Sequence, residues 1–197
     1  LINEIAVLCE QVGADSGEVE KGLKSDSRLG AHAYVRPGDA FSGGTLARDV
    51  VFLNQLASQH GLNHPLLKNI LASNEAHRTW LKNKLRHVLK TLPGKRALLF
   101  GLANKSGSDI WRQSGTLLLA EWLRAQKAEV RAYDPWVRSV PQGIESILEL
   151  VPSLEIGLKD ADALIVFTDG EELKTVTVDQ LIAWMRSPVI FDPNRLV

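Results

Sequence analysis

The 197-residue chain has little cysteine and no surplus of charge of either sign. Its single cysteine, Cys9, excludes a disulfide within the chain and is typical of a reducing compartment. Twenty-three basic residues balance 23 acidic ones, which argues against the basic surface that nucleic-acid binding needs. No apolar run approaches the length of a membrane span. We therefore expect a cytoplasmic globular protein without nucleic-acid or membrane partners.

Two common site signatures are also missing. His60 and His64 lie four residues apart, but Gly61 and Pro65 interrupt the helix that would place both on one face, so we predict no metal site. The apolar run that ends at Gly101 lacks the second and third glycines of a dinucleotide fingerprint. A nicotinamide cofactor is therefore not indicated by any local motif.

The first half of the chain has helical periodicity. Three stretches place apolar residues on one helical face: 1–13, about 47–60, and 65–92. In the second stretch we expect four side chains to face inward: Val51, Leu53, Leu56 and Ala57. The third stretch is long enough to predict helix packing, including packing between subunits. The chain opens at Leu1 inside a helical pattern, so we expect further sequence before it.

After Pro93 and Gly94 the pattern changes, because short apolar runs now alternate with helical segments. The strand-like runs are 97–102, 129–135, 162–169 and 188–192. Strands that alternate with helices predict a parallel sheet with crossover helices. The sequence therefore predicts an α/β protein with two domains, a helical domain at 1–93 and a parallel-sheet domain at 94–197.

Candidate ligand residues follow the first two strands of the second domain, where doubly wound sheets bind their ligands. The segment GLANKSGSDIWRQS offers Lys105, Asp109 and Arg112 for a phosphate or a sugar, with a solvated loop as the alternative. Asp134 closes the second strand, where an acid could bind a ribose; alternatively, Asp134 and Pro135 simply end that strand.

In the first domain, the stretch PGDAFSGGTLARDV at 37–50 is a loop that leads into a helix. Gly43 and Gly44 carry no side chain, so the backbone amides there could approach a ligand closely. The loop holds neither cysteine nor histidine, and a purely structural role is the alternative.

Five segments, taken in order, resemble motifs of the UDP-glucose/GDP-mannose dehydrogenase family. They are LINEIAVLCEQVGAD (1–15), DSRLG (26–30), YVRPGDAFSGGTLARDV (34–50), GLANKSGSDIWRQS (101–114) and AEVRAYDP (128–135). Their order and spacing make the resemblance specific, and it spans nearly the whole chain as the family's central and C-terminal domains. The region 34–74 resembles the GDP-mannose branch more closely.

The resemblance implies a central domain at 1–93 that forms a homodimer through its long helices. It implies a Rossmann-like domain at 94–197 that binds a UDP- or GDP-linked sugar. The family oxidises the sugar C6 alcohol to an acid with NAD, through a thioester on a catalytic cysteine. The NAD-binding domain of the family precedes its central domain, so we expect it upstream of Leu1 and not in this chain.

Aligned without gaps, the family's catalytic cysteine falls on Thr45 and the aspartate of its loop on Asp49. The resemblance also implies substrate-binding positions, which are Arg28, Tyr34, Arg36, Phe41, Gly43, Lys105, Asp109, Arg112 and Arg195. A thiol supplies some thiolate near neutral pH, whereas a threonine hydroxyl needs an adjacent base. We therefore expect impaired oxidation; the alternative is a non-catalytic pseudoenzyme that acts as a dimeric nucleotide-sugar-binding or scaffold module.

Overall fold

The computed structural model describes residues 1–41, 44–102, 114–168 and 170–192. Contacts divide the chain into two compact units, Leu1–Trp80 and Leu81–Val197. The division falls within the long helix α4, Pro65–Leu89, rather than at residue 93. The last turns of α4 belong to the second unit, in which Leu85 is fully buried.

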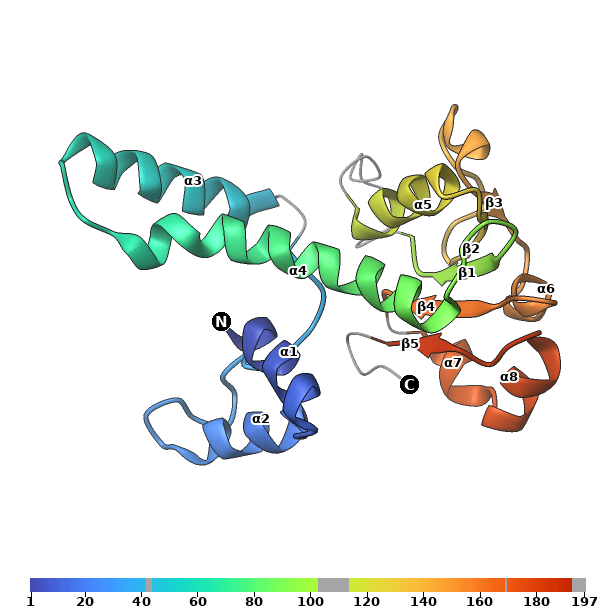
Figure 1. Cartoon of the computed structure of the whole chain (residues 1–197), viewed down its shortest axis with the longest axis horizontal. Helices are drawn as coiled ribbons and strands as arrows, with labels where there is room; N and C mark the ends of the chain where they lie inside the picture. Colours follow the sequence, from blue (N-terminus) through green and yellow to red (C-terminus); the bar gives the residue numbers. More distant parts are fainter. Residues whose placement is uncertain (42–43, 103–113, 169, 193–197) are drawn as a thin grey trace. The chain divides into compact units, whose positions relative to one another are not determined.

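The first unit is helical, with α1 at Ile2–Val12, α2 at Ser16–Ser25, α3 at Gly44–Gln59 and the first turns of α4 (Figure 1). Helix α1 ends at Gly13, whose left-handed φ of 71° suits a glycine cap. Helix α2 begins at Ser16, where the Asp15 carboxylate accepts the Gly17 amide at 2.8 Å. Pro65 occupies the first turn of α4, where its missing amide proton leaves no hydrogen bond unmade.

Helix α3 lies against α4, and the Asn54 amide links them by donating to the Leu67 carbonyl at 3.1 Å. Ala57 is buried in this unit, as expected. The inward orientation predicted for three other side chains is wrong for the single chain, because they are at least 40% exposed: Val51, Leu53 and Leu56. One neighbouring helix covers only one side of α3, so part of its apolar surface stays open.

The second unit contains a parallel sheet, which confirms the prediction from alternating strands and helices. Its strands are β1 (Arg96–Phe100), β2 (Glu129–Tyr133), β3 (Glu149–Leu150), β4 (Ala163–Val166) and β5 (Ile190–Phe191). Their order is β3-β2-β1-β4-β5, with every pair parallel. The two-residue β3 was not predicted, because so short a run has no detectable periodicity.

Helices cover both faces of this sheet. Figure 1 shows α5 (Gly115–Ala125) on one side of the strands and α7 (Glu171–Thr175) and α8 (Val178–Trp184) on the other. The cluster on the second side joins Leu98 and Phe100 of β1 to residues of α6 (Leu154–Leu158) and α8. A single turn of 3₁₀ helix, Ile144–Ser146, precedes β3. Burial on both faces explains why these strands read as continuous apolar runs.

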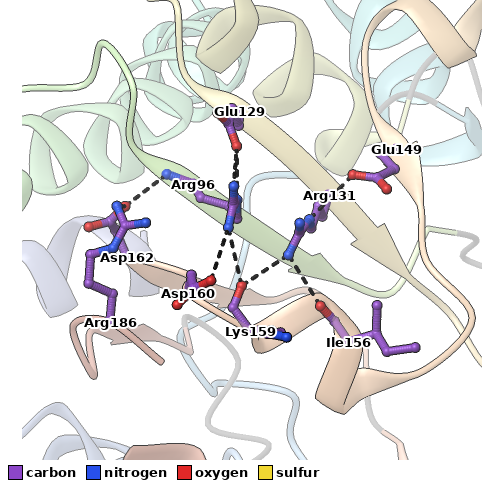
Figure 2. A network of polar contacts seen from close by, with 9 residues as sticks. All are labelled: Arg96, Glu129, Arg131, Glu149, Ile156, Lys159, Asp160, Asp162 and Arg186. Atoms are coloured by element: carbon purple, nitrogen blue, oxygen red, sulfur yellow. Dashed lines mark hydrogen bonds and ion pairs between the residues drawn. The ribbon is translucent and has the colours of Figure 1, made fainter. Parts of the chain in front are cut away.

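Arg96, at the start of β1, and Arg131, in the middle of β2, bind the last turn of α6 (Figure 2). Arg131 donates to the carbonyls of Ile156 at 3.2 Å and Lys159 at 3.0 Å, and Arg96 donates to the Lys159 carbonyl at 3.4 Å. A helix leaves its last carbonyls without intrahelical partners and carries partial negative charge there, so two guanidinium groups stabilise this end.

A buried carboxylate fastens β1 to β4 at the same edge. Asp162 accepts the Arg96 amide and the Lys95 ammonium, each at 2.9 Å. Burial opposes ionisation of Asp162, but the Arg96 amide and the Lys95 charge outweigh it and hold the pKa below its ordinary value. Ion pairs therefore link neighbouring strands at the amino-terminal edge of the sheet.

Candidate functional site

The opposite, carboxyl-terminal edge of the sheet has the geometry of a ligand site. Phe100 pairs with both Tyr133 of β2 and Val166 of β4, so the residues that follow these strands meet at one edge. The strand order reverses between β1 and β4. In open parallel sheets, ligands bind in the crevice that forms at this switch point.

Gly101 begins the loop after β1 in a conformation that only glycine readily adopts. Its φ is +90°, and an added Cβ would lie 2.0 Å from the Thr168 Oγ1. The Gly101 amide donates to the Tyr133 carbonyl at 2.8 Å, and its carbonyl accepts the Thr116 hydroxyl at 3.0 Å. The chain therefore leaves β1 along one defined path.

Asp134, at the end of β2, supports the same path. Its side chain is buried, with Oδ2 accepting the Leu102 amide and Oδ1 accepting the Trp136 amide, both at 2.9 Å. Both carboxylate oxygens thus face backbone amides of the protein. This geometry does not support the ribose-binding interpretation of Asp134. Besides ending the strand, Asp134 holds the backbone of Leu102 and Trp136.

Tyr133 joins the end of β2 to the start of α7. Its hydroxyl donates to the Glu172 carboxylate at 2.7 Å, and its ring packs edge-on against Phe100 with centroids 5.8 Å apart. Burial, and to a smaller extent the hydrogen bond to Glu172, raises the pKa of Tyr133 to about 12. The sequence does not predict this pair, since no local pattern links residues 39 positions apart.

In the first unit, Thr45 and Asp49 lie four residues apart on α3 and are both exposed. This spacing puts them on the same side of the helix. Thr45 lies in the first turn, where the unpaired amides create a partial positive charge. Asp49 is 3.5 Å from the Arg48 guanidinium, a surface contact of small energetic value.

The loop before Thr45 is anchored by polar side chains from α1 and α4. The Gly38 amide donates to Asn3 at 3.0 Å, and the Gly38 carbonyl lies 2.8 Å from His77 Nε2. The backbone of Phe41 forms two bonds with Asn74, at 3.0 and 2.8 Å. None of these anchors was predicted; their signal in the sequence is that polar residues interrupt the apolar stripe of α4.

The remaining predicted residues in the first unit have local partners. Arg28 is exposed and pairs with Asp26 at 2.6 Å, which holds the pKa of that carboxyl below its ordinary value. Arg36 lies 3.6 Å from Glu20 of α2, and Tyr34 is 90% exposed. The ion pairs of the two arginines run to these neighbours and not to α3.

Five predicted site residues lie outside the described residues: Gly43, Lys105, Asp109, Arg112 and Arg195. Within the described part of the chain, no three His, Cys, Asp or Glu side chains are grouped to hold a metal ion. In that same part, no helix combines the length and apolarity needed to cross a membrane.

Two family models match this chain. The central domain of the UDP-glucose/GDP-mannose dehydrogenase family matches residues 1–76, and the UDP binding domain of that family matches residues 98–197. The matches agree with the two-part organisation and with the order of motifs along the sequence.

Individual relatives share the same arrangement. UDP-glucose 6-dehydrogenase TuaD of Bacillus subtilis is 30% identical over 99% of this chain and 42% of its own length. A UDP-D-ManNAc dehydrogenase structure from Pyrococcus horikoshii superposes with TM-score 0.76 at 28% identity, covering all of this chain and 44% of that one. A UDP-glucose dehydrogenase structure from Pyrobaculum islandicum, at 23% identity and TM-score 0.83, covers 99% of this chain and 44% of its own and supports the fold alone.

The chain thus spans less than half the length of the relatives that it matches. Within that span, the two domain matches cover residues 1–76 and 98–197, and the parallel sheet lies within the second of them. The chain belongs to the UDP-glucose/GDP-mannose dehydrogenase family.

Proposed function

We propose that this chain is the dimer-forming and nucleotide-sugar-binding part of a nucleotide-sugar 6-dehydrogenase homologue. The observation that carries this proposal is the carboxyl-terminal edge of the sheet at β1 and β4. There, hydrogen bonds fix the backbone of Gly101 and Leu102, and both residues lie in the region that matches a UDP binding domain. The nucleotide would bind at this edge, with Lys105 as the cation that follows in the same segment.

A uridine nucleotide is the better candidate. The matching domain is described as UDP binding, and curated relatives such as the Bacillus subtilis and Pseudomonas aeruginosa proteins are named UDP-glucose 6-dehydrogenases. The likeness of region 34–74 to the GDP-mannose branch was the sequence argument for guanosine. Because the nucleotide would meet the second domain, we give the match of that domain more weight.

We propose that the oxidation is impaired because Thr45 stands where the family has its nucleophilic cysteine. A threonine hydroxyl becomes a nucleophile only when an adjacent base takes its proton. Among the described residues, no hydrogen bond connects Thr45 to such a base. Asp49 is exposed on the same side of α3, and water screens the effect of an exposed carboxylate. This observation also favours the second candidate function, a pseudoenzyme that retains binding and dimer formation.

NAD, the cofactor that the resemblance implies, does not fit the described residues. A pyrophosphate cradle needs free backbone amides after the first strand. Here the amides of Gly101 and Leu102 are already bonded to Tyr133 and Asp134. We therefore assign no NAD site to this part of the chain and derive no step through the cofactor.

The test is calorimetric titration of the chain with UDP-glucose and with GDP-mannose. We expect saturable binding of UDP-glucose that weakens about tenfold or more in Lys105→Ala, since hydrogen bonds to charged groups are the stronger ones. Lys159→Ala is the matched control, because Lys159 is exposed at the opposite edge of the sheet. A folded chain that binds neither sugar nucleotide would contradict the proposal.

Homodimer formation through the helical unit is part of the same proposal. Its support is the apolar surface left open on α3 and α4, where Phe52 is 59% and Leu66 is 81% exposed. Light scattering should give twice the mass of one chain. Phe52→Lys should shift the protein toward monomer, while Ser58→Lys, an exposed polar position on a different side of the same helix, should not. A monomeric wild-type chain would contradict this part.

A further inference from the structure

The last turns of α4 carry positive charge that no acidic residue balances along the sequence. Residues 82–96 contain six lysines and arginines and no aspartate or glutamate, although the whole chain has no net charge. The two cations nearest β1 are already paired with carboxylates of the sheet. Lys82 and Arg86, by contrast, form no ion pair with any residue that the structure describes. Their charges are therefore not neutralised within the described chain.

Trp122 of α5 holds these two cations close together. The Lys82 ammonium lies 5.9 Å and the Arg86 guanidinium 4.9 Å from the centroid of its ring. All three residues belong to the second unit, and the two cations are four residues apart on one side of α4. The face of an aromatic ring attracts a cation by about 0.5–1 kcal/mol at an exposed site, but the ring carries no net charge. It orients both cations without neutralising either.

Another pair of cations in the same unit shows a different arrangement. Arg96 and Arg131 bind carbonyls at the end of α6, and each also pairs with a glutamate of a neighbouring strand (Figure 2). Cations near the end of a helix stabilise it by themselves, so stabilisation of α4 is the alternative explanation for Lys82 and Arg86. Because no described carboxylate pairs with them, both charges are also available to an anion from solution.

We propose that Lys82 and Arg86 form a binding site for a phosphate group of a small soluble ligand. The guanidinium offers paired N–H donors that fit two phosphate oxygens, and the ammonium adds a compact second charge. A phosphate group with two negative charges balances both side chains. The site is separate from the proposed nucleotide edge, because Trp122 lies in the last turn of α5, which leads to the start of β2. The inference does not rest on the proposed function.

The experiment is a titration of the full chain with pyrophosphate at constant ionic strength, followed by tryptophan fluorescence. Subtracting the response of Trp122→Phe isolates the signal of Trp122, since phenylalanine keeps an aromatic face but does not emit in the same range. An anion bound by both cations changes the charge beside the ring, so we expect a saturable change in emission. Lys82→Gln and Arg86→Gln should each weaken pyrophosphate binding about fivefold, the upper range for one exposed ion pair.

Arg124→Gln is the matched control, because it removes the same charge from an exposed position of α5. Arg124 is two residues from Trp122 and so lies on another side of that helix, and the variant should bind pyrophosphate like the wild type. An equal loss in Arg124→Gln would overturn the inference, because it would show attraction to overall charge alone. If Arg86→Gln does not fold, Lys82→Gln carries the same comparison.

Two further measurements identify the site and the ligand class. Lys105→Ala should leave the response of Trp122 unchanged; a lost response would place pyrophosphate at the proposed nucleotide site and overturn the inference. A wild-type chain without a saturable response to pyrophosphate would also overturn it. Binding of that chain to phosphatidylserine vesicles would then assign the two cations to a membrane surface instead.

Discussion

Gly101 passes so close to Thr168 that a Cβ added to the glycine would lie 2.0 Å from the threonine Oγ1. The contact joins the end of β1 to the residues after β4, on either side of the proposed nucleotide edge. Thr168 therefore occupies the space that any side chain at position 101 would need.

Gly101→Ala should destabilise the second unit more than Gly143→Ala. Both glycines have positive φ, +90° and +93°, but Gly143 has nothing within 4 Å of an added Cβ. Gly143→Ala should cost about 1–2 kcal/mol from backbone conformation alone. Gly101→Ala should cost about 1–3 kcal/mol more, because of the clash. Urea unfolding measures both, and equal midpoints would show that Thr168 moves aside freely.

Tyr133 should lose its proton at a higher pH than an ordinary tyrosine does. Burial and the Glu172 carboxylate raise its pKa to about 12, against an ordinary value of about 10. Subtracting the ultraviolet titration of Tyr133→Phe from that of the wild type isolates this group. Glu172→Gln should lower the pKa part of the way, because burial is the larger cause. A pKa of Tyr133 near the ordinary tyrosine value would contradict its burial and its hydrogen bond to Glu172.

The same shift has a consequence for stability at high pH. The folded state holds the Tyr133 proton more tightly than the unfolded state does. Its contribution is therefore fully present below about pH 10 and is lost as the pH rises toward about 12. The difference in unfolding free energy between wild type and Tyr133→Phe should shrink across that window. A difference that stays constant there would show that Tyr133 titrates alike in both states.

Asp162→Asn should lower the free energy of unfolding most near neutral pH. The pKa of Asp162 is held low in the folded state, so its stabilising effect is present above the unfolded value of about 3.9 and is lost as the pH falls through the folded value. We expect a loss of about 2 kcal/mol at pH 7 that narrows in acid. Unfolding by urea at several pH values measures it, and a loss independent of pH would contradict the role of the charge.

A cysteine at position 45 should be reactive. Thr45 is exposed in the first turn of α3, where helix amides favour a thiolate, whereas Ser58 is exposed in the last turn of the same helix. Thr45→Cys should react with iodoacetamide about fivefold faster than Ser58→Cys. Mass spectrometry of the labelled chain measures both rates, with buried Cys9 as an internal reference. Equal rates would show that the helix terminus does not increase the reactivity of a thiol at position 45.

Much of the secondary structure could be predicted, because its signals are local. Helical periodicity marked α1 and α4, and alternation of apolar runs with helices marked the parallel sheet. The cap residues Gly13 and Asp15 act within their own turns. The short strand β3 escaped prediction, because its two residues pair through the backbone and leave no sequence pattern.

The site was predicted only in outline. The segment after β1 and Asp134 were identified by their place at strand ends, but the interpretation of Asp134 left out its amide partners. Leu102 and Asp134 are 32 residues apart, and the register between β1 and β2 brings them together. The exposed side chains of α3 were misjudged for a related reason, since periodicity marks an apolar face without saying what covers it.

By itself, the sequence determined the family and the order of the elements, and it predicts that Thr45 stands at the family's cysteine position, because each depends on which residues follow one another. Only the tertiary structure decided that Asp134 accepts a hydrogen bond from Leu102, that Thr168 requires glycine at position 101, and that Tyr133 donates a hydrogen bond to Glu172. These contacts join residues from different strands and helices. Their distances depend on how the sheet pairs and on how the helices pack against it, and no local pattern records either.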